Sequence, residues 1–386
     1  MSTLIDRVKR MAGGFDKQTL KSIEINPLVI EAGAIHGVAP YVRDKGYTRV
    51  LVAADAVTYD IAGRTLEEEL AALGITVQVT LIKPDRQGDV IADEASIVQL
   101  LLDIQARDAE VVVAAGSGTI HDISRYAAYT SHIPFVSVPT APSVDGFNSK
   151  GAPIIIRGEK KTIAAIGPDA LFADLDILSA APARLVAAGF GDMLGKYTSL
   201  LDWSFGAAEG GEPYSPEVAE ITRMALNKCV EHAERIAARD QDGIRVLIEA
   251  LIESGLAMLL FGQSHSASGA EHHLSHYWEM EYIRLGKRQL LHGAKVGVAC
   301  AEISKLYHRL AESDGGLAFA SEPDKLRSAI TALPDEKQIR GWLRQVGGPS
   351  TTGELGVDEE LLRRSLQEAH HVRPNRYTVL KAFNSQ

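Results

Sequence analysis

The chain has 386 residues, which at roughly 150 residues per domain leaves room for two domains with large cores. With 46% apolar and 23% charged residues, it has the composition of a folded globular protein, not of a disordered one. Its net charge of −10 argues against a nucleic-acid partner, because binding to a phosphate backbone needs a basic surface. A small phosphorylated substrate remains compatible, since a local pocket can be positive inside an acidic protein.

Two features predict a protein of the reducing cytoplasm. Cys229 and Cys300 are the only cysteines and lack CxxC spacing, so neither a disulfide framework nor a thiolate metal site is indicated. The first residues, MSTLIDRVKRMAGGFDK, carry charges every few positions and lack the apolar core of a signal peptide. No later run approaches the ~18 apolar residues of a membrane helix. We expect a cytoplasmic location and no membrane span.

From residue 49 to 140, short β-branched runs alternate with longer amphipathic stretches. The runs predict four buried strands, at 49–56, 75–82, 110–116 and 133–140. The stretches between the first three runs predict helices, at 61–74 and 90–109. This alternation is typical of an α/β fold in which helices cover both faces of a parallel sheet.

The character of the chain changes near Pro182. Residues 151–168 have a polar centre between two apolar arms and predict a β-hairpin. Beyond Pro182 the periodicity is helical, most clearly at 216–239 and 244–262, and 206–217 is the best candidate for a loop. We therefore expect a Rossmann-like domain at 1–181 and an all-helical domain at 182–386, with the ligand in the cleft between them.

Two segments predict contacts with a cofactor. The strand at 110–116 runs through Ser117 and Gly118 into a helical pattern, and such a turn offers free N–H groups and a positive dipole end to a pyrophosphate. Glycines also occur in such turns for steric reasons alone. Asp55 could bind a ribose or cap the next turn, and 140–149 places hydroxyls and a carboxylate where α/β folds bind ligands.

A third cluster predicts a metal site. Asp192 lies in an apolar helical run, where a buried carboxylate needs a partner. Four of the twelve histidines fall at positions 272–292, and His272 and His276 share one face of a helix. One carboxylate with two imidazoles leaves a coordination position open for substrate. Glu271 is an alternative to Asp192 as ligand, or a helix-capping residue, and clustered histidines are often merely structural.

Five ordered segments between about residues 49 and 300 resemble the glycerol-1-phosphate dehydrogenases, most closely their bacterial branch. The wider group includes glycerol dehydrogenase, iron-containing alcohol dehydrogenases and dehydroquinate synthase. Two departures stand out: Ala294 where many relatives have glutamate, and Ser117 where many have glycine. The segments are GSGTIHD, VPTAPSVDGF, AGFGDMLGKYTSLLDW, SGAEHHLSH and LHGAKVG.

The resemblance implies roles for individual residues. Asp192, His272 and His292 would bind one divalent metal ion, for which zinc and nickel are favoured over iron. Asp145, Asp192 and His276 would contact substrate, with Asp192 and His276 as the catalytic pair. The residues expected to contact NAD(H) or NADP(H) are Asp55, Gly118, Thr119, Ile120, His121, Asp122, Thr140, Ala141, Pro142, Ser143 and Ser149.

The implied reaction interconverts dihydroxyacetone phosphate and sn-glycerol 1-phosphate. The metal would polarise the C2 carbonyl, the nicotinamide would deliver hydride, and His276, which we expect to titrate near neutral pH, would relay a proton. We also expect a homo-oligomer, a dimer. The alternatives are a glycerol dehydrogenase, a cyclising lyase and a non-catalytic binding protein. Candidate cations for the phosphate are Lys150, Lys160, Lys161, Arg284, Lys287 and Arg288.

Overall fold

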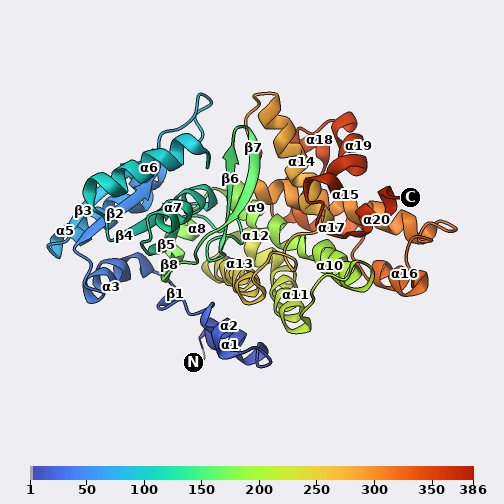
Figure 1. The fold of residues 1–386 in the computed structure, drawn as a ribbon, viewed down its shortest axis with the longest axis horizontal. Helices are drawn as coiled ribbons and strands as arrows, with labels where there is room; N and C mark the ends of the chain where they lie inside the picture. Colours follow the sequence, from blue (N-terminus) through green and yellow to red (C-terminus); the bar gives the residue numbers. More distant parts are fainter. Residues whose placement is uncertain (1–2) are drawn as a thin grey trace.

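The computed structural model describes residues 3–386 and places a sheet-containing half beside a helical half (Figure 1). The sheet half contains six parallel strands in the order β1-β8-β5-β4-β2-β3. Four of them correspond to the strands expected from the sequence, and β1 and β8 are additional. The strands are β1 (Leu28–Glu31), β2 (Arg49–Ala54), β3 (Thr76–Leu81), β4 (Val111–Gly116), β5 (Phe135–Pro139) and β8 (Ala170–Asp174).

Helices cover both faces of this sheet, as the near-continuous apolar strands predict. On β2, Val50 and Val52 face one apolar cluster, whereas Leu51 and Ala53 face another. The helices and helical turns of this half are η1 (Ala34–Gly37), α3 (Val38–Asp44), α4 (Ala56–Thr58), η2 (Tyr59–Gly63), α5 (Arg64–Ala72), α6 (Glu94–Arg107), α7 (Gly118–Thr130) and α8 (Leu175–Ser179).

The expected hairpin is present and lies between the two halves in Figure 1. It consists of β6 (Gly151–Ile156) and β7 (Glu159–Ala164), paired antiparallel. Lys160 joins it to the helical half: its backbone N–H donates to Met280 Sδ at 3.3 Å, and its ammonium lies 2.8 Å from Glu279 Oε2. The hairpin thus connects the sheet half to α14.

The helical half begins at α9, for which Pro182 is the N-terminal flanking residue. Its longest helices, α13 and α15, have 21 residues each. Its elements are α9 (Ala183–Leu194), α10 (Lys196–Gly210), α11 (Pro216–Glu231), α12 (Ala233–Ala238), α13 (Gln241–Phe261), α14 (Ala270–Arg284), α15 (His292–Glu312), α16 (Pro323–Thr331), α17 (Glu336–Gln345), α18 (Thr352–Leu355), α19 (Glu359–Glu368), η3 (Ala369–Val372) and α20 (Val379–Asn384).

Two details differ from the expectation for this half. The segment 206–217 is a loop only at 211–215, because α10 continues through Gly210. Tyr377 packs so closely that a Cβ on Gly210 would lie 2.6 Å from the Tyr377 Cβ, so glycine is retained here for packing and not as a helix breaker. The helix expected at 216–239 is interrupted at His232, between α11 and α12.

The first helices, α1 (Leu4–Met11) and α2 (Lys17–Lys21), extend the helical half. Val8 and Ala12 belong to the same apolar cluster as residues of α11 and α13, and Arg7 forms an ion pair with Glu253. The chain therefore starts on the helical side and then enters the sheet.

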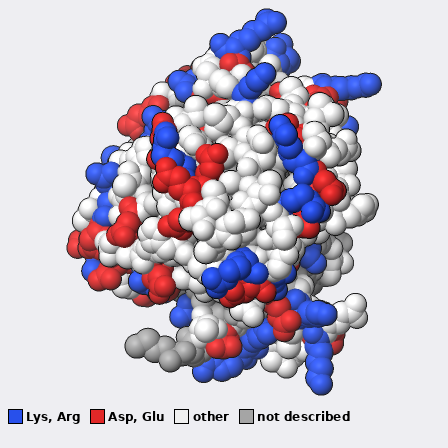
Figure 2. Space-filling model, turned by 90° about the vertical axis from the view of Figure 1, so that its left-hand side faces the viewer, with Lys and Arg blue, Asp and Glu red and all other residues white. Residues whose placement is uncertain are grey.

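Figure 2 shows that Lys and Arg are interspersed with Asp and Glu on the face formed by the sheet half. Neither sign forms a continuous stripe on this face. Within residues 3–386, no helix combines the length and the apolar composition that crossing a bilayer requires.

Candidate active site

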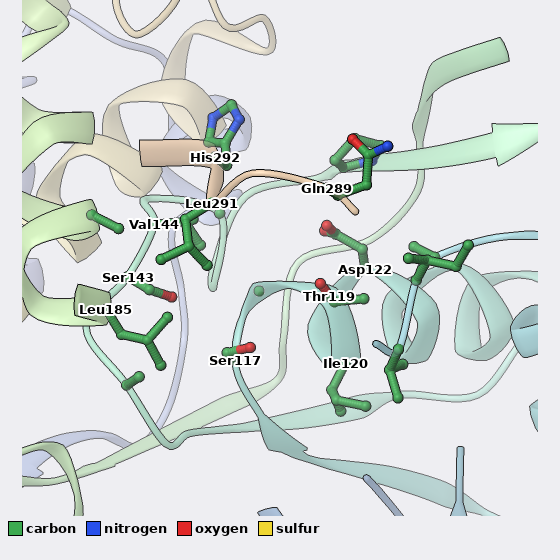
Figure 3. A pocket seen from close by; sticks show the side chains of 18 of the residues that line it. Ser117, Thr119, Ile120, Asp122, Ser143, Val144, Leu185, Gln289, Leu291 and His292 are labelled. Carbon is green, nitrogen blue, oxygen red and sulfur yellow. The ribbon is translucent and has the colours of Figure 1, made fainter. Parts of the chain in front are cut away.

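A cavity of about 1440 Å³ lies between the two halves. It is larger than the ~300–1,000 Å³ of ordinary small-ligand pockets, which leaves space for a dinucleotide together with a small substrate. Loops that follow β2, β4 and β5 form its floor, at the carboxyl edge of the sheet. In Figure 3, Ser117 and Thr119 lie on one side of the cavity, and Leu291 and His292 lie across from them.

Three helices bring Asp192, His272 and His292 together at the helical end of this cavity. They belong to α9, α14 and α15, and one potential ligand atom from each lies within 4.8 Å of the other two. The His272 and His292 rings are 5.3 Å apart, and Asp192 is fully buried beside them. These three residues would offer one metal ion three ligand atoms, the number that catalytic zinc sites take from the protein.

Glu271 orients one of these rings. Its Oε1 lies 2.7 Å from His272 Nδ1, and its Oε2 accepts a hydrogen bond from Thr198 Oγ1 at 2.6 Å. A carboxylate at Nδ1 makes that nitrogen the donor and leaves the lone pair of Nε2 facing Asp192 Oδ1, 3.8 Å away. Glu271 therefore orients the His272 ring, and Asp192 is the carboxylate of the candidate trio.

Burial adjusts the charges of the trio in a way that suits a cation. It lowers the pKa values of His272 and His292 well below their usual range, so both rings are neutral and can coordinate. It raises the pKa of Asp192 to about 6, with the Asp145 carboxylate acting in the same direction. A bound metal ion would offset the free-energy cost of burying this carboxylate. The side chains of Asp192, His272 and His292 are therefore suited to holding a divalent metal ion.

Lys196, which the sequence analysis did not select, lies one helical turn after Asp192 and is fully buried. Its ammonium lies 2.8 Å from Asp145 Oδ2 and 3.3 Å from Asp192 Oδ1. Burial opposes its charge, but these two carboxylates raise its pKa above the usual value. The i, i+4 spacing of Asp192 and Lys196 was the available sequence signal.

Asp145 comes from the loop after β5 and reaches the same cluster. Its backbone N–H donates to Asp192 Oδ2 at 3.0 Å, and its Oδ2 accepts a hydrogen bond from Ser254 Oγ at 2.8 Å. The structure thus brings Asp145 next to Asp192, and its role as a substrate contact stays a prediction.

His276 lines the cavity, and its ring centroid is 6.2 Å from those of both His272 and His292. Burial lowers its pKa well below the usual value, and Lys160 acts in the same direction. Our expectation that His276 titrates near neutral pH is therefore wrong: desolvation keeps its imidazole neutral there.

Most of the expected cofactor residues line the cavity, and two do not. The side chain of His121 is buried behind the turn, with Nε2 2.7 Å from Ser137 Oγ, and Pro142 packs its carbonyl towards Gly189. Asp55 lines the cavity and also caps α4, because its Oδ1 accepts from the N–H groups of Val57 and Thr58. The residues in the wall are Asp55, Gly118, Thr119, Ile120, Asp122, Thr140, Ala141, Ser143 and Ser149.

The steric explanation for the glycine turn also has support. A Cβ on Gly116 would lie 2.5 Å from the Ile120 Cβ, so the turn requires a small residue whether or not a ligand binds. Ser117, in the place where many relatives have glycine, lines the cavity. Ala294 is buried in the apolar cluster that contains Leu274 and Val298, so no carboxylate acts from that position.

The structure separates the candidate cations into two groups. Lys150, Lys160 and Arg288 line the cavity, whereas Lys161, Arg284 and Lys287 do not. Three cavity cations were missed by the sequence analysis: Lys295, Arg373 and the exposed Arg184. Burial lowers the pKa of Lys295 to about 8, although Glu279 Oε2 lies 2.6 Å from its ammonium.

Relatives that match this chain over nearly their full length identify its protein family. The chain is 46% identical to glycerol-1-phosphate dehydrogenase [NAD(P)+] of Geobacillus thermodenitrificans, over 100% of this chain and 98% of the relative. It is 44% identical to the enzyme of the same name from Bacillus subtilis, over 100% of this chain and 97% of the relative. The chain belongs to the glycerol-1-phosphate dehydrogenase family.

Broader comparisons agree with this assignment. Residues 29–182 match the family model described as iron-containing alcohol dehydrogenase. The fold is similar to that of glycerol dehydrogenase from Schizosaccharomyces pombe, with a TM-score of 0.67 at 18% identity, over 93% of this chain and 85% of that one. The chain thus shares its overall fold with this glycerol dehydrogenase.

Proposed function

We propose that the chain is a metal-dependent, NAD(P)-linked dehydrogenase that interconverts dihydroxyacetone phosphate and sn-glycerol 1-phosphate. The observation that carries the proposal is the convergence of Asp192, His272 and His292 at one end of a cavity whose floor is the carboxyl edge of the sheet. The full-length similarity to glycerol-1-phosphate dehydrogenases supports the choice of substrate.

Each part of the cavity has its own task in this reaction. The wall formed by Gly118, Thr119 and Thr140 holds the dinucleotide against the N-terminus of α7. Asp192, His272 and His292 hold the metal, which when bound supplies a Lewis acid for the substrate carbonyl. Lys196 and Asp145 keep the carboxylate of Asp192 in place through the contacts described above.

His276 holds a proton close to the reacting oxygen. Because its imidazole is neutral, one ring nitrogen carries a hydrogen and the other can accept one, so the ring can pass a proton between substrate and solvent without changing charge overall. We propose zinc or nickel as the resident metal, with iron as the third choice, and either NAD(H) or NADP(H) as the cofactor. We also propose a cytoplasmic homodimer.

The deciding experiment follows NADH and NADPH oxidation with dihydroxyacetone phosphate after the metal is stripped. Zinc, nickel, iron and manganese are then returned one at a time. We expect no turnover without metal and recovery with at least one ion. Absence of turnover with every ion would refute the proposal.

The same assay separates the alternatives. A glycerol dehydrogenase would oxidise glycerol as efficiently as glycerol 1-phosphate. A cyclising lyase would show no net consumption of NADH, since it regenerates its cofactor. A binding protein would bind the ligands without turnover.

A further inference from the structure

A segment near the end of the chain returns to the wall of the cavity. Arg376 Nη1 donates to the carbonyl of Ser268 at 2.6 Å, and its Nε lies 3.3 Å from the Glu212 carboxylate. The backbone N–H of Tyr377 also donates to Glu212, at 2.5 Å. These contacts attach residues 376–377 to two loops: the one between α13 and α14, through Ser268, and the one between α10 and α11, through Glu212.

One buried carboxylate fixes this segment relative to the metal trio. Asp202 Oδ1 accepts from the backbone N–H of Val379 at 2.9 Å, and its Oδ2 accepts from that of Ala270 at 2.8 Å. Ala270 is the first residue of α14, two positions before His272. The segment therefore has a defined position at the metal end of the cavity.

Arg373 extends from this segment into the cavity wall. Its Nη1 donates to Ser268 Oγ at 2.9 Å and contacts Ser264 Oγ at 3.4 Å, and both serines also line the cavity. Arg373 has no ion-pair partner within residues 3–386: no carboxylate oxygen lies within 4.0 Å of its guanidinium nitrogens. Burial lowers its pKa to about 10, which still leaves the guanidinium charged at neutral pH.

The other cavity cations have counterions or contact solvent. Lys160 and Lys295 share Glu279, at 2.8 and 2.6 Å. Arg288 pairs with Asp89 at 2.6 Å, and Lys150 and Arg184 are exposed to solvent. Withdrawing a charge from water is costly unless an opposite charge compensates it, so Arg373 is the cavity cation with the greatest need for an anionic ligand.

We propose that Arg373, together with the hydroxyls of Ser264 and Ser268, forms the subsite that receives the phosphate group of the substrate. A guanidinium offers two parallel donors that match two phosphate oxygens, and the serine hydroxyls add further donors. The proposal rests on the proposed function for the identity of the substrate. It assigns Arg373 the role of discriminating phosphorylated from unphosphorylated trioses.

The first test compares two substrates in Arg373→Gln. We expect kcat/KM for dihydroxyacetone phosphate to fall about 100-fold, as expected for loss of charge-assisted hydrogen bonds, and that for dihydroxyacetone to change less than about threefold. Arg373→Lys should recover part of the lost kcat/KM, because lysine restores the positive charge but not the two parallel N–H donors of a guanidinium. Arg284→Gln is the matched control, since this arginine lies outside the cavity and is paired with Glu281 at 2.8 Å. Equal loss with both substrates in Arg373→Gln, or no loss, would overturn the subsite.

A second test uses binding instead of turnover. Calorimetry on the metal-free protein should detect glycerol 1-phosphate binding to the wild type and at least tenfold weaker binding to Arg373→Gln. Anion binding that depends on Arg373 in a protein that never reduces dihydroxyacetone phosphate would support the subsite and refute the proposed function. If Arg373→Gln leaves the turnover of dihydroxyacetone phosphate unchanged, the proposed function stands and the subsite is refuted.

If the Arg373 variants do not fold, Ser268→Ala decides. The affinity of this variant for glycerol 1-phosphate should fall several-fold, and unchanged affinity refutes the proposal.

Discussion

At the scale of single residues, the site consists of groups whose charge is controlled by burial. The sequence analysis selected Asp192, His272 and His292, and the structure brings them together. It left Glu271 as a rival ligand, because only the hydrogen bond to His272 Nδ1 reveals its supporting role. Arg373 could not be selected, since no motif marks it and its proximity to His272 arises from tertiary contacts alone.

Replacing His292 with alanine should abolish metal binding and turnover together. The remaining Asp192 and His272 offer two ligands, which is too few for a stable catalytic site. The check is metal content per chain and the rate of NADH oxidation. His308→Ala is the control, because this histidine lies on the same helix and bonds to the Ser304 carbonyl. An active, metal-free His292→Ala would contradict the assignment.

Metal loading should weaken as the pH falls below about 6. The raised pKa of Asp192 means that its carboxyl keeps a proton up to that pH, and a proton competes with the metal for the oxygen. The histidines do not compete there, since their pKa values lie well below 6.5. We expect the affinity to fall about tenfold per pH unit below 6, measured by titration of the metal-free protein. A constant affinity between pH 5 and 7 would contradict this explanation.

The same carboxyl should make the metal-free protein less stable as the pH rises from about 4 to 6. In that range the folded state retains a proton on Asp192 that the unfolded chain releases near 3.8. Stability falls with increasing pH wherever the folded state binds more protons. Comparing denaturant unfolding of the wild type with that of Asp192→Asn isolates this contribution, and identical pH profiles would show that it is absent.

At the scale of elements, the site depends on the close contact of α9 and α15. A Cβ on Gly293 would lie 1.9 Å from the carbonyl oxygen of Ala188, and one on Gly191 would lie 2.5 Å from that of Gly293. The two helices therefore touch through their backbones, which places Asp192 against His292. Glycine at these positions serves close approach.

Gly293→Ala should push α9 and α15 apart and weaken metal binding. We expect a loss of stability of about 1–3 kcal/mol from overpacking, and a lower affinity for the metal, because two of its ligands move apart. Gly341→Ala is the matched control: it lies in α17, and a Cβ there would meet nothing within 4 Å. Denaturant unfolding and metal titration give the two readouts, and unchanged metal affinity in a destabilised Gly293→Ala would contradict the geometric argument.

The elements that the sequence predicted were those with strong periodicity. The runs that became β2, β3, β4 and β5 are rich in β-branched residues, so they were recognised. The strand β1 has only four residues, none of them buried, and β8 contains no β-branched residue. Such segments carry a weak strand signal, and their pairing with each other and with β5 is a tertiary effect.

At the scale of the whole molecule, the cavity is shared by both halves. In Figure 3, Thr119 from the sheet half and Leu185 from the helical half line the same cavity. The sequence predicted two domains and a cleft, and the change of periodicity at Pro182 coincides with the start of α9. It did not reveal that α1 and α2 pack with the helical half, because their partners are over 200 residues away.

Cofactor binding should therefore stabilise the molecule as one unit. A ligand at 100 times its dissociation constant adds about 2.7 kcal/mol to the free energy of unfolding when it binds only the folded state. We expect NADH or NADPH to shift a single unfolding transition, seen by calorimetry. Two transitions of which only one responds would show that the halves unfold independently.

The placement of the three candidate metal ligands in one half bears on how the two halves can move relative to each other. Asp192, His272 and His292 all belong to helices of one half, and α9 and α15 are in backbone contact. The turn at Gly118 belongs to the other half. A hinge movement that widens the cleft would lengthen the path between the hydride donor and its acceptor and leave the coordination sphere intact. With such a movement, cofactor exchange and metal retention would be kinetically separate, so the enzyme would release its dinucleotide in every turnover without releasing its ion.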